Sequence, residues 1–256
     1  MDLPVVEVDP DIEEGTRKRL EALLTAKGWS EPQRNVEIYF SHGGSHSQFQ
    51  YFQPRVPEYG RRRLLVSGAG LGTQMLVARA WGFQEIVGTE VEEGFVELIR
   101  DRLAGREGFD VVHTSGVGLP FPDEHFTSIH SSHVIEHTGA PEGYLREHLR
   151  VLSPGGLLYL EFPNRFHRTE LHTRLPSFEW LPKPLRWIAL RFLQTRFSGL
   201  PWDRRNEYRI VRMTLSPVSL PQVRFWLWKL GAAGGAVIHH EAPLPGFVRV
   251  LIRKRG

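Results

Sequence analysis

The sequence predicts an α/β fold built on a mostly parallel sheet, and three observations support the prediction. From about residue 62 onward, short apolar runs alternate with segments of helical periodicity, which is the pattern of strands joined by helical crossovers. The first apolar run, Leu64 to Ser67, breaks into three alternating glycines before a helix begins. The second run ends at an acidic residue, Glu90. A binding crevice is therefore expected at the carboxyl ends of the strands.

The expected core elements follow from these runs and from the turn residues between them. In chain order they are strand 62–67, helix 71–81, strand 84–89, helix 92–104, strand 109–114, strand 126–132, helix 140–152 and strand 156–162. Apolar residues recur every four positions in the helix after Glu90, which indicates a face buried against the sheet. The sequence Ser153 to Gly156 is expected to form a turn before the last of these strands.

Two segments are expected before the sheet. Residues 11–27 start at an N-cap signal, Pro10-Asp11, carry apolar residues at near-helical spacing and stop at Gly28, so they predict a helix. Residues 36–60 combine aromatic and polar side chains. So many exposed aromatic residues would favour aggregation, and the segment is therefore expected to cover a site or a sheet edge.

After residue 164 the pattern changes. Proline and tryptophan become frequent and the alternation of strands and helices is lost, which predicts an insertion. A helix at about 219–230 and strands at about 235–240 and 247–253 are expected to complete the sheet. The predicted organisation is an N-terminal helix and cover segment (1–60), a ligand-binding core (61–164), an insertion or lid (165–218) and a C-terminal helix with strands (219–256).

Composition argues against several classes of function. The 256 residues include 32 basic and 29 acidic side chains, so the charges nearly balance. The basic runs at 61–63 and 253–255 are expected to be solvated strand ends. Nucleic-acid binding is therefore not favoured. The chain has no cysteine, which excludes disulfides, thiolate metal sites and a cysteine nucleophile. It shows no signal sequence and no apolar run of about 20 residues, and a cytoplasmic protein without a transmembrane segment is expected.

The glycines at positions 68, 70 and 72 predict a ligand loop, because a backbone without Cβ atoms can turn sharply close to a ligand. The helix that follows would direct its N-terminal N–H groups towards a carboxylate or phosphate. A dinucleotide-binding loop needs its third glycine at position 73, where the chain has Thr73, so NAD is not favoured. A tight turn without a ligand is the alternative.

The spacing Gly68-x-Gly70-x-Gly72 resembles motif I of the class I S-adenosylmethionine (SAM) methyltransferases. The methyltransferase type 11 family, which includes the quinone-biosynthesis methyltransferases, has three further motifs similar in order and spacing to Leu119 to Phe126, His133-Val134-Ile135-Glu136-His137 and Leu152 to Gly156. The resemblance covers about residues 60–164. It implies a Rossmann-like, seven-stranded sheet with its last strand antiparallel, helices on both faces, and SAM across the carboxyl ends of the first four strands.

The resemblance also implies which residues hold SAM, with S-adenosylhomocysteine as the product. The methionine would lie over the glycine loop, the adenine near two valines and the loop after the third strand, and the methyl group near the end of the fourth strand. The residues near the methionine would be Gly68, Ala69, Gly70 and Gly72. Those near the adenine would be Val91, Val117, Ser115 and Gly116, and those near the methyl group Ser132 and His133. Glu90 is expected to accept hydrogen bonds from both ribose hydroxyls.

Two departures from the family pattern bear on SAM affinity. Motif I usually has an acidic residue where this chain has Val66, and Ser115 replaces an aspartate that contacts the adenine. A hydroxyl is a weaker acceptor than a carboxylate, by about 1 kcal/mol. Weaker SAM binding, or a non-catalytic descendant, is therefore an alternative.

Two histidines are candidate general bases for an acceptor hydroxyl. An imidazole beside the methyl group, at His133 or His137, is suited to removing a proton near neutral pH. The alternatives are that His133 only lines the pocket and that Glu136 and His137 order the loop after the fourth strand. The same residues match a zinc-binding pattern, but the strand-end position of His133 and the lack of a third ligand argue against a metal.

The acceptor pocket is expected to form from segments outside the shared core. Phe49, Tyr51 and His167 are the predicted substrate-binding residues, and a helix at about 185–197, apolar on all sides, is a predicted lid. The expected function is SAM-dependent methyl transfer to a small molecule of aromatic or lipid-like character, at a hydroxyl oxygen. The alternatives are an RNA-modifying methyltransferase, a catalytically silent SAM-binding protein and an NAD-dependent oxidoreductase.

Overall fold

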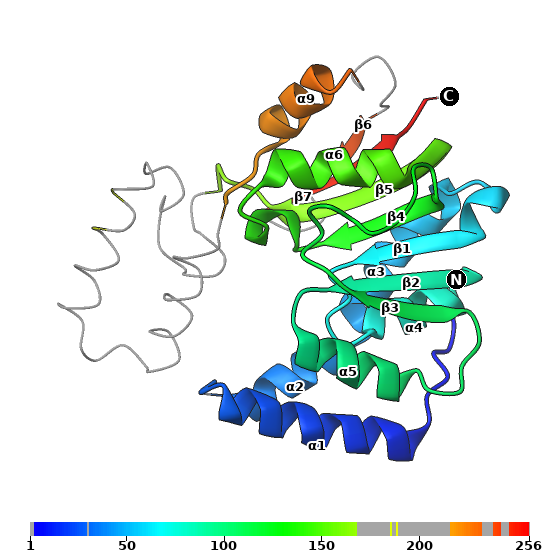
Figure 1. Ribbon diagram of the computed structural model, residues 1–256, viewed down its shortest axis with the longest axis vertical. Helices are drawn as coiled ribbons and strands as arrows, with labels where there is room; N and C mark the ends of the chain where they lie inside the picture. Colours follow the sequence, from blue (N-terminus) through cyan, green and yellow to red (C-terminus); the bar gives the residue numbers. More distant parts are fainter. Residues whose placement is uncertain are drawn as a thin grey trace.

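A seven-stranded sheet forms the centre of the computed structural model, which describes residues 3–29, 31–167, 185, 188, 216–231, 238–241 and 246–255 (Figure 1). The strands are β1 (Arg63–Ser67), β2 (Glu85–Glu90), β3 (Phe109–His113), β4 (Phe126–Ser132), β5 (Leu152–Pro163), β6 (Ile238–Glu241) and β7 (Phe247–Arg253). Their order is β3-β2-β1-β4-β5-β7-β6. Strands β1 to β5 pair in parallel, whereas β7 is antiparallel to β5 and β6. The predicted fold class is confirmed.

Helices cover both faces of this sheet (Figure 1). They are α1 (Pro10–Ala26), α2 (Pro32–Phe40), α3 (Gly43–Phe52), α4 (Thr73–Ala80), α5 (Glu93–Arg102), α6 (Pro141–Val151) and α9 (Leu220–Lys229), with 3-10 helices η1 (Gln53–Arg55), η2 (Glu58–Arg61) and η3 (Ile135–His137). α3, α4 and α5 share an apolar cluster with one face of the sheet, and α6 and α9 share a cluster with the other. Side chains alternate across β1, so Leu64 joins the first cluster and Leu65 the second.

Three predicted boundaries move for local reasons. α1 begins at Pro10, because the carboxylate of Asp9 caps it, one residue before the predicted signal. α4 begins at Thr73 and not at residue 71, because Gly72 at its N-cap has a left-handed backbone with φ 77°. The predicted turn 153–156 belongs to β5, which starts at Leu152 and shifts register where it pairs with β4.

The aromatic segment 36–60 is largely helical and serves two purposes. α3 places Phe49 and Phe52, both fully buried, against the sheet. α2 packs with α1 on α5, where Leu20, Phe40 and Phe95 belong to a third apolar cluster. The N-terminal segments therefore extend the core beside the first strands.

Most of the predicted insertion lies outside the described residues, and so does the predicted lid helix 185–197 apart from positions 185 and 188. The description resumes at residue 216, and α9 then leads to the two strands that complete the sheet. Within the described ranges, the structure contains no helix with the length and apolar character needed to cross a bilayer.

Candidate active site

A cavity of about 700 Å³ opens at the carboxyl ends of β1, β2 and β4. The glycine loop, the end of β2, the loop after β3 and the turn after β4 supply most of its wall, and residues of α2, α3, α4 and α5 complete it. The predicted cofactor residues on this wall are Gly68, Ala69, Gly70, Glu90, Val91, Ser115, Gly116, Ser132 and His133. The fold thus brings four separate segments of the predicted site to one cavity.

The glycine loop has a backbone that side chains would disturb. A Cβ on Gly68, where φ is 70°, would collide with Val134 Cγ2. Gly70 faces the Tyr39 ring, 3.7 Å from the position of a Cβ. Gly72 is not among the described residues that line the cavity, and its carbonyl accepts the hydrogen bond from Leu76 N–H that starts α4. The structure gives Gly72 a role in the joint between loop and helix, and its contact with a ligand stays a prediction.

The Glu90 carboxylate fastens the end of β2 to the glycine loop. Oε2 accepts a hydrogen bond from Gly70 N–H at 2.9 Å, and Oε1 accepts from Val91 N–H at 2.8 Å and Glu92 N–H at 3.3 Å. Burial raises the pKa of Glu90, while these three N–H groups act in the opposite direction. Oε1 has both lone pairs engaged, whereas Oε2 retains one. The carboxylate is therefore arranged to accept one further hydrogen bond from a ligand in the cavity.

The loop after β3 supplies the side of the cavity predicted for adenine. The Ser115 hydroxyl donates to Val117 O at 3.3 Å, so its oxygen remains able to accept a hydrogen bond. Gly116 lies against the Tyr144 ring, 2.9 Å from the position of a Cβ, which leaves no room for a side chain. Val91 lines the cavity, but Val117 is not among the described residues on its wall and is 37% exposed. A contact between Val117 and the adenine therefore stays a prediction.

A buried polar network under the glycine loop was missed from the sequence. His148 Nδ1 lies 2.7 Å from Tyr144 O, and a carbonyl only accepts, so this nitrogen carries the proton and Nε2 accepts from Ser67 Oγ at 2.9 Å. Ser67 Oγ in turn accepts from Tyr144 Oη at 2.7 Å. Burial lowers the pKa of His148 to about 4, so the ring is neutral.

Val66, where the family usually has an acidic residue, is fully buried in the core.

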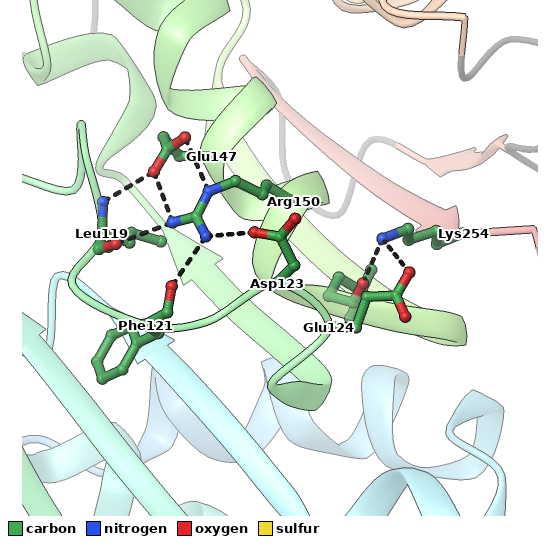
Figure 2. A network of polar contacts seen from close by, with 8 residues as sticks. Leu119, Phe121, Asp123, Glu124, Glu147, Arg150 and Lys254 are labelled. Atoms are coloured by element: carbon green, nitrogen blue, oxygen red, sulfur yellow. Dashed lines mark hydrogen bonds and ion pairs between the residues drawn. The ribbon is translucent and has the colours of Figure 1, made fainter.

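The stretch 119–126, part of the predicted family pattern, is tied to α6 by one arginine (Figure 2). Arg150 donates to the carbonyl oxygens of Leu119 at 2.9 Å and Phe121 at 2.8 Å. The same guanidinium pairs with Asp123 at 2.8 Å and Glu147 at 2.9 Å, and Glu147 also accepts from Leu119 N–H. These contacts hold the chain that leaves the adenine side of the cavity.

His133 and His137 both line the cavity, with Glu136 between them. Glu136 Oε1 lies 3.7 Å from His133 Nδ1 and 3.8 Å from His137 Nε2, and its side chain is 2% exposed. His133 has a left-handed backbone with φ 58°, so the chain turns sharply between β4 and η3. Within the described ranges, no group of three potential metal ligands is assembled.

Behind Ser132 and His133 lies a second buried carboxylate, Glu161 of β5. Its oxygens accept hydrogen bonds from Gln48 Nε2 at 2.9 Å, Tyr159 Oη at 2.6 Å and Arg249 Nε at 2.9 Å. Gln48 Nε2 also lies 2.8 Å from Ser132 Oγ. This network joins α3, β5 and β7 to the cavity wall. No local sequence pattern marks it, since its members come from distant parts of the chain.

The N-terminal helices add residues to the cavity that were not singled out in the sequence. Tyr39 lies on the wall, edge-on to Phe95 with ring centroids 5.3 Å apart, and its carbonyl accepts from Thr73 Oγ1 at 2.7 Å. Arg102 of α5, 2% exposed, donates to Thr73 Oγ1 and pairs with Glu13 of α1 at 2.6 Å. These bonds lock α1 and α2 onto the start of α4.

The predicted acceptor residues do not gather at the cavity. Phe49 is fully buried and stacks on His130, with ring centroids 4.6 Å apart, so it is a core residue and its predicted placement is wrong. Tyr51 packs against Tyr159, and the Arg249 guanidinium lies over the Tyr51 ring, 4.8 Å from the ring centroid. Tyr51 is not among the described residues on the cavity wall. His167 is the last described residue before the gap at residues 168–184, and its role stays a prediction.

The fold and the site agree with the class of protein expected from the sequence. A parallel sheet with an antiparallel β7, a glycine loop after β1 and a carboxylate at the end of β2 are features of the class I SAM-dependent methyltransferase fold. Residues 65–160 match the family described as "Methyltransferase domain". The matched residues run from β1 into β5 and contain the glycine loop and Glu90.

Known proteins are similar in sequence to part of this chain. A demethylmenaquinone methyltransferase of Clavibacter sepedonicus is 36% identical over 98 residues, which cover 38% of this chain and 40% of that protein. A ubiquinone/menaquinone biosynthesis C-methyltransferase UbiE of Pseudomonas entomophila is 32% identical over 133 residues, 47% of this chain and 50% of that protein. The matches thus span half or less of these relatives' length.

Solved structures resemble the whole fold at low sequence identity. A SAM-dependent methyltransferase from Mesorhizobium loti has a TM-score of 0.58 and 16% identity, with 81% of this chain and 98% of that chain covered. A SAM-dependent methyltransferase from Thermotoga maritima, described as a possible histamine N-methyltransferase, has a TM-score of 0.54 and 17% identity, with 93% and 99% covered. The likeness therefore extends beyond the matched family region into the flanking elements.

Proposed function

We propose that this protein binds SAM in the cavity and transfers its methyl group to a small-molecule acceptor. The observation that carries the proposal is the Glu90 carboxylate, which lies on the cavity wall, is fixed to Gly70 and keeps a lone pair on Oε2 for a ribose hydroxyl. The other groups suit the rest of the molecule: the half-buried glycine backbone on the cavity wall for the methionine and the Ser115 oxygen for the adenine amino group. We place the transferable methyl group beside Ser132 and His133.

The protein's own chemical task is positioning and proton removal. SAM supplies a methyl group already attached to a good leaving group, so the chain must align the acceptor and exclude water. We assign proton removal to His137, because it lines the cavity and has Glu136 Oε1 3.8 Å from Nε2. A neighbouring carboxylate stabilises the imidazolium that forms when a histidine accepts a proton.

The class of acceptor is proposed from the relatives together with the cavity. One relative is named as a methyltransferase of demethylmenaquinone, and the other as a C-methyltransferase of ubiquinone and menaquinone biosynthesis. We propose a quinol-type aromatic ring as the acceptor, methylated on a ring carbon. This differs from the hydroxyl oxygen expected from the sequence. A ring oxygen is the second candidate, because either reaction begins with loss of a hydroxyl proton and so uses His137 in the same way.

The proposal is tested with deuteromethyl-SAM and a reduced short-chain naphthoquinone. Mass spectrometry should show transfer of one methyl group, and NMR of the product should locate it on carbon. Calorimetry should in parallel show one site per chain for S-adenosylhomocysteine and none for NAD. If S-adenosylhomocysteine does not bind at about 1 mM, where even a weak complex would form, the proposed function is wrong. If it binds and the quinol is unchanged, only the acceptor assignment fails.

A further inference from the structure

The turn after β4 brings His133 to the cavity wall between two buried carboxylates. His133 Nδ1 lies 3.7 Å from Glu136 Oε1, and His133 Nε2 lies 3.5 Å from Glu161 Oε1. Glu136 and Glu161 come from different elements, and their side chains are 2% and 6% exposed, whereas that of His133 is 39% exposed. The imidazole is therefore the part of this cluster that meets the cavity.

Charge balance in this cluster calls for a second cation. Arg249 neutralises Glu161 through an Nε–Oε2 contact of 2.9 Å. Neither oxygen of Glu136 receives a hydrogen bond from any described residue, and its neighbours are the rings of His133 and His137. A buried carboxylate without a positive partner is strongly unfavourable. His133 faces both carboxylates, so a proton on His133 places one positive charge against Glu136 and Glu161 together.

The surroundings of His133 support the protonated ring. Burial lowers the pKa of His133, but the two carboxylates outweigh burial and raise it to about 9. Among the described residues, Arg249 is the other charged group behind the ring, and it donates to Oε2 of Glu161, the oxygen that does not face His133. His130 beneath it is uncharged, because burial lowers its pKa to about 3. On the β7 side the ring meets Phe247 edge-on, with centroids 5.0 Å apart.

The backbone fixes the position of this ring. His133 has φ 58°, a conformation that is unfavourable for residues other than glycine. Its N–H donates to Glu161 O at 2.9 Å, so the turn is tied to the end of β5. Main chain and side chain of His133 are thus both attached to the same glutamate.

We infer that His133 is a fixed imidazolium on the acceptor side of the cavity and selects an acceptor whose reacting group is an anion, such as the phenolate or enolate form of a ring hydroxyl. The inference rests on the proposed function. With both carboxylates behind the ring, an acceptor meets the positive end of the cluster. His133 is then a specificity-determining residue and not the general base predicted from the sequence.

The transfer step balances with such an acceptor. His137 or solvent takes the hydroxyl proton first, which leaves the negative charge on the ring. An electron pair of this anion forms the bond to the methyl carbon, while the carbon–sulfur bond breaks and its pair stays on sulfur. The negative charge of the acceptor and the positive charge of the sulfonium disappear together. When the methyl group is on a ring carbon, that carbon then loses its hydrogen as a proton to solvent, and the ring oxygen takes up a proton, which restores the aromatic hydroxyl. His133 keeps its proton throughout.

The protonation of His133 can be measured without cofactor or acceptor. In protein labelled with ¹⁵N-histidine, NMR should show one imidazole still protonated at about pH 8, and this signal should be absent in His133→Gln. Glu161→Gln should move its titration to lower pH, whereas His125→Gln, a half-buried histidine outside the described cavity wall, should not. If the signal lost in His133→Gln titrates near pH 6.5 in the wild type, the inference is wrong.

Selection for an anion is tested with two probes of nearly equal size. We expect 2-hydroxy-1,4-naphthoquinone, an anion at neutral pH, to bind the protein saturated with S-adenosylhomocysteine about tenfold more tightly than neutral 1,4-naphthoquinone. The preference should be lost in His133→Gln and kept in His125→Gln. Equal binding of the two probes by the wild type would overturn the inference while leaving the proposed function intact. Absence of S-adenosylhomocysteine binding would instead remove the proposed function, and the NMR titration would still decide the charge of His133.

Discussion

The two sides of the cavity to which we assign the cofactor and the acceptor, called here the cofactor half and the acceptor half, are built by different means. The cofactor half, formed by the glycine loop, Glu90 and the loop after β3, relies on backbone groups: Glu90 is held by three N–H groups. The acceptor half, formed by the turn after β4 and the network behind it, relies on charged side chains contributed by η3, β5 and β7. The first half is therefore specified by local sequence and the second by the tertiary fold.

This difference suggests how the two halves respond to substitution. Changes in the cofactor half should alter backbone conformation and SAM affinity. Changes in the acceptor half should disturb buried charge and with it the stability of the sheet. The following substitutions are chosen to test that distinction.

The largest effect is expected from Arg249→Met. This change removes the closest cation from Glu161 in a site where both side chains are less than a tenth exposed, and it should lower the free energy of unfolding by about 3 to 5 kcal/mol. Arg63→Met removes an exposed ion pair of similar length with Glu85 and should cost less than about 1 kcal/mol. Urea unfolding of both variants measures the contrast. Equal losses would mean that the Glu161 network has no special weight.

The next effect is a loss of stability in acid. Burial lowers the pKa of His130 to about 3 and that of His148 to about 4, so each ring gains a proton on unfolding below pH 6.5. The unfolded chain then binds more protons, and stability should fall by up to about 1.4 kcal/mol per pH unit for each ring. His133 acts in the opposite sense: its raised pKa stabilises the fold below pH 6.5 and this contribution is lost as the pH rises to about 9.

His130→Phe isolates part of the acid effect. Both ring nitrogens of His130 are buried without a hydrogen-bond partner in the described structure, between the rings of Phe49 and Tyr159. A phenyl ring should therefore be tolerated at pH 7 and should reduce the loss of stability between about pH 7 and pH 5. His113→Gln, at an exposed position, serves as the control. An unchanged acid loss in His130→Phe would show that this histidine is not the buried neutral group described.

A further effect on stability, comparable in size to that of Arg249→Met, is expected from Gly68→Ala in the cofactor half. Gly68 and Gly82 both have positive φ, but only at Gly68 would the new Cβ collide with a neighbour, Val134. Gly82→Ala should cost about 1 to 2 kcal/mol from backbone strain, and Gly68→Ala about 1 to 3 kcal/mol more from the clash. Thermal unfolding measures both variants. Identical values would mean that the turn after β4 moves away freely.

The sequence predicts the cofactor half well for a physical reason. The three glycines and Glu90 meet requirements of the local backbone, so their pattern can be recognised in the sequence alone. The predicted helix boundaries were wrong where a capping residue sets the start of the helix, as at Asp9 and Gly72. A cap depends on backbone geometry, and the periodicity of apolar residues does not indicate that geometry.

The acceptor half is hidden from the sequence because its partners are far apart in the chain. Gln48 lies 84 positions from Ser132 and 113 positions from Glu161, and no local pattern connects them. Phe49 was placed in the pocket because an aromatic segment suggested a cover. The spacing of Phe49, Phe52 and Val56 at i, i+3 and i+7 is a helical stripe, and it indicates the core position that the structure shows.

One calorimetric experiment tests the separation of the two halves most directly. S-adenosylhomocysteine is titrated into the wild type, Glu90→Ala, His137→Gln and the exposed control Glu97→Ala. We expect one site per chain, a loss of about 1.5 to 3 kcal/mol in Glu90→Ala because hydrogen bonds to a charged acceptor disappear, and little change in His137→Gln or Glu97→Ala. Wild-type affinity in Glu90→Ala, or an equal loss in His137→Gln, would contradict the assignment of the cofactor to the Glu90 side of the cavity.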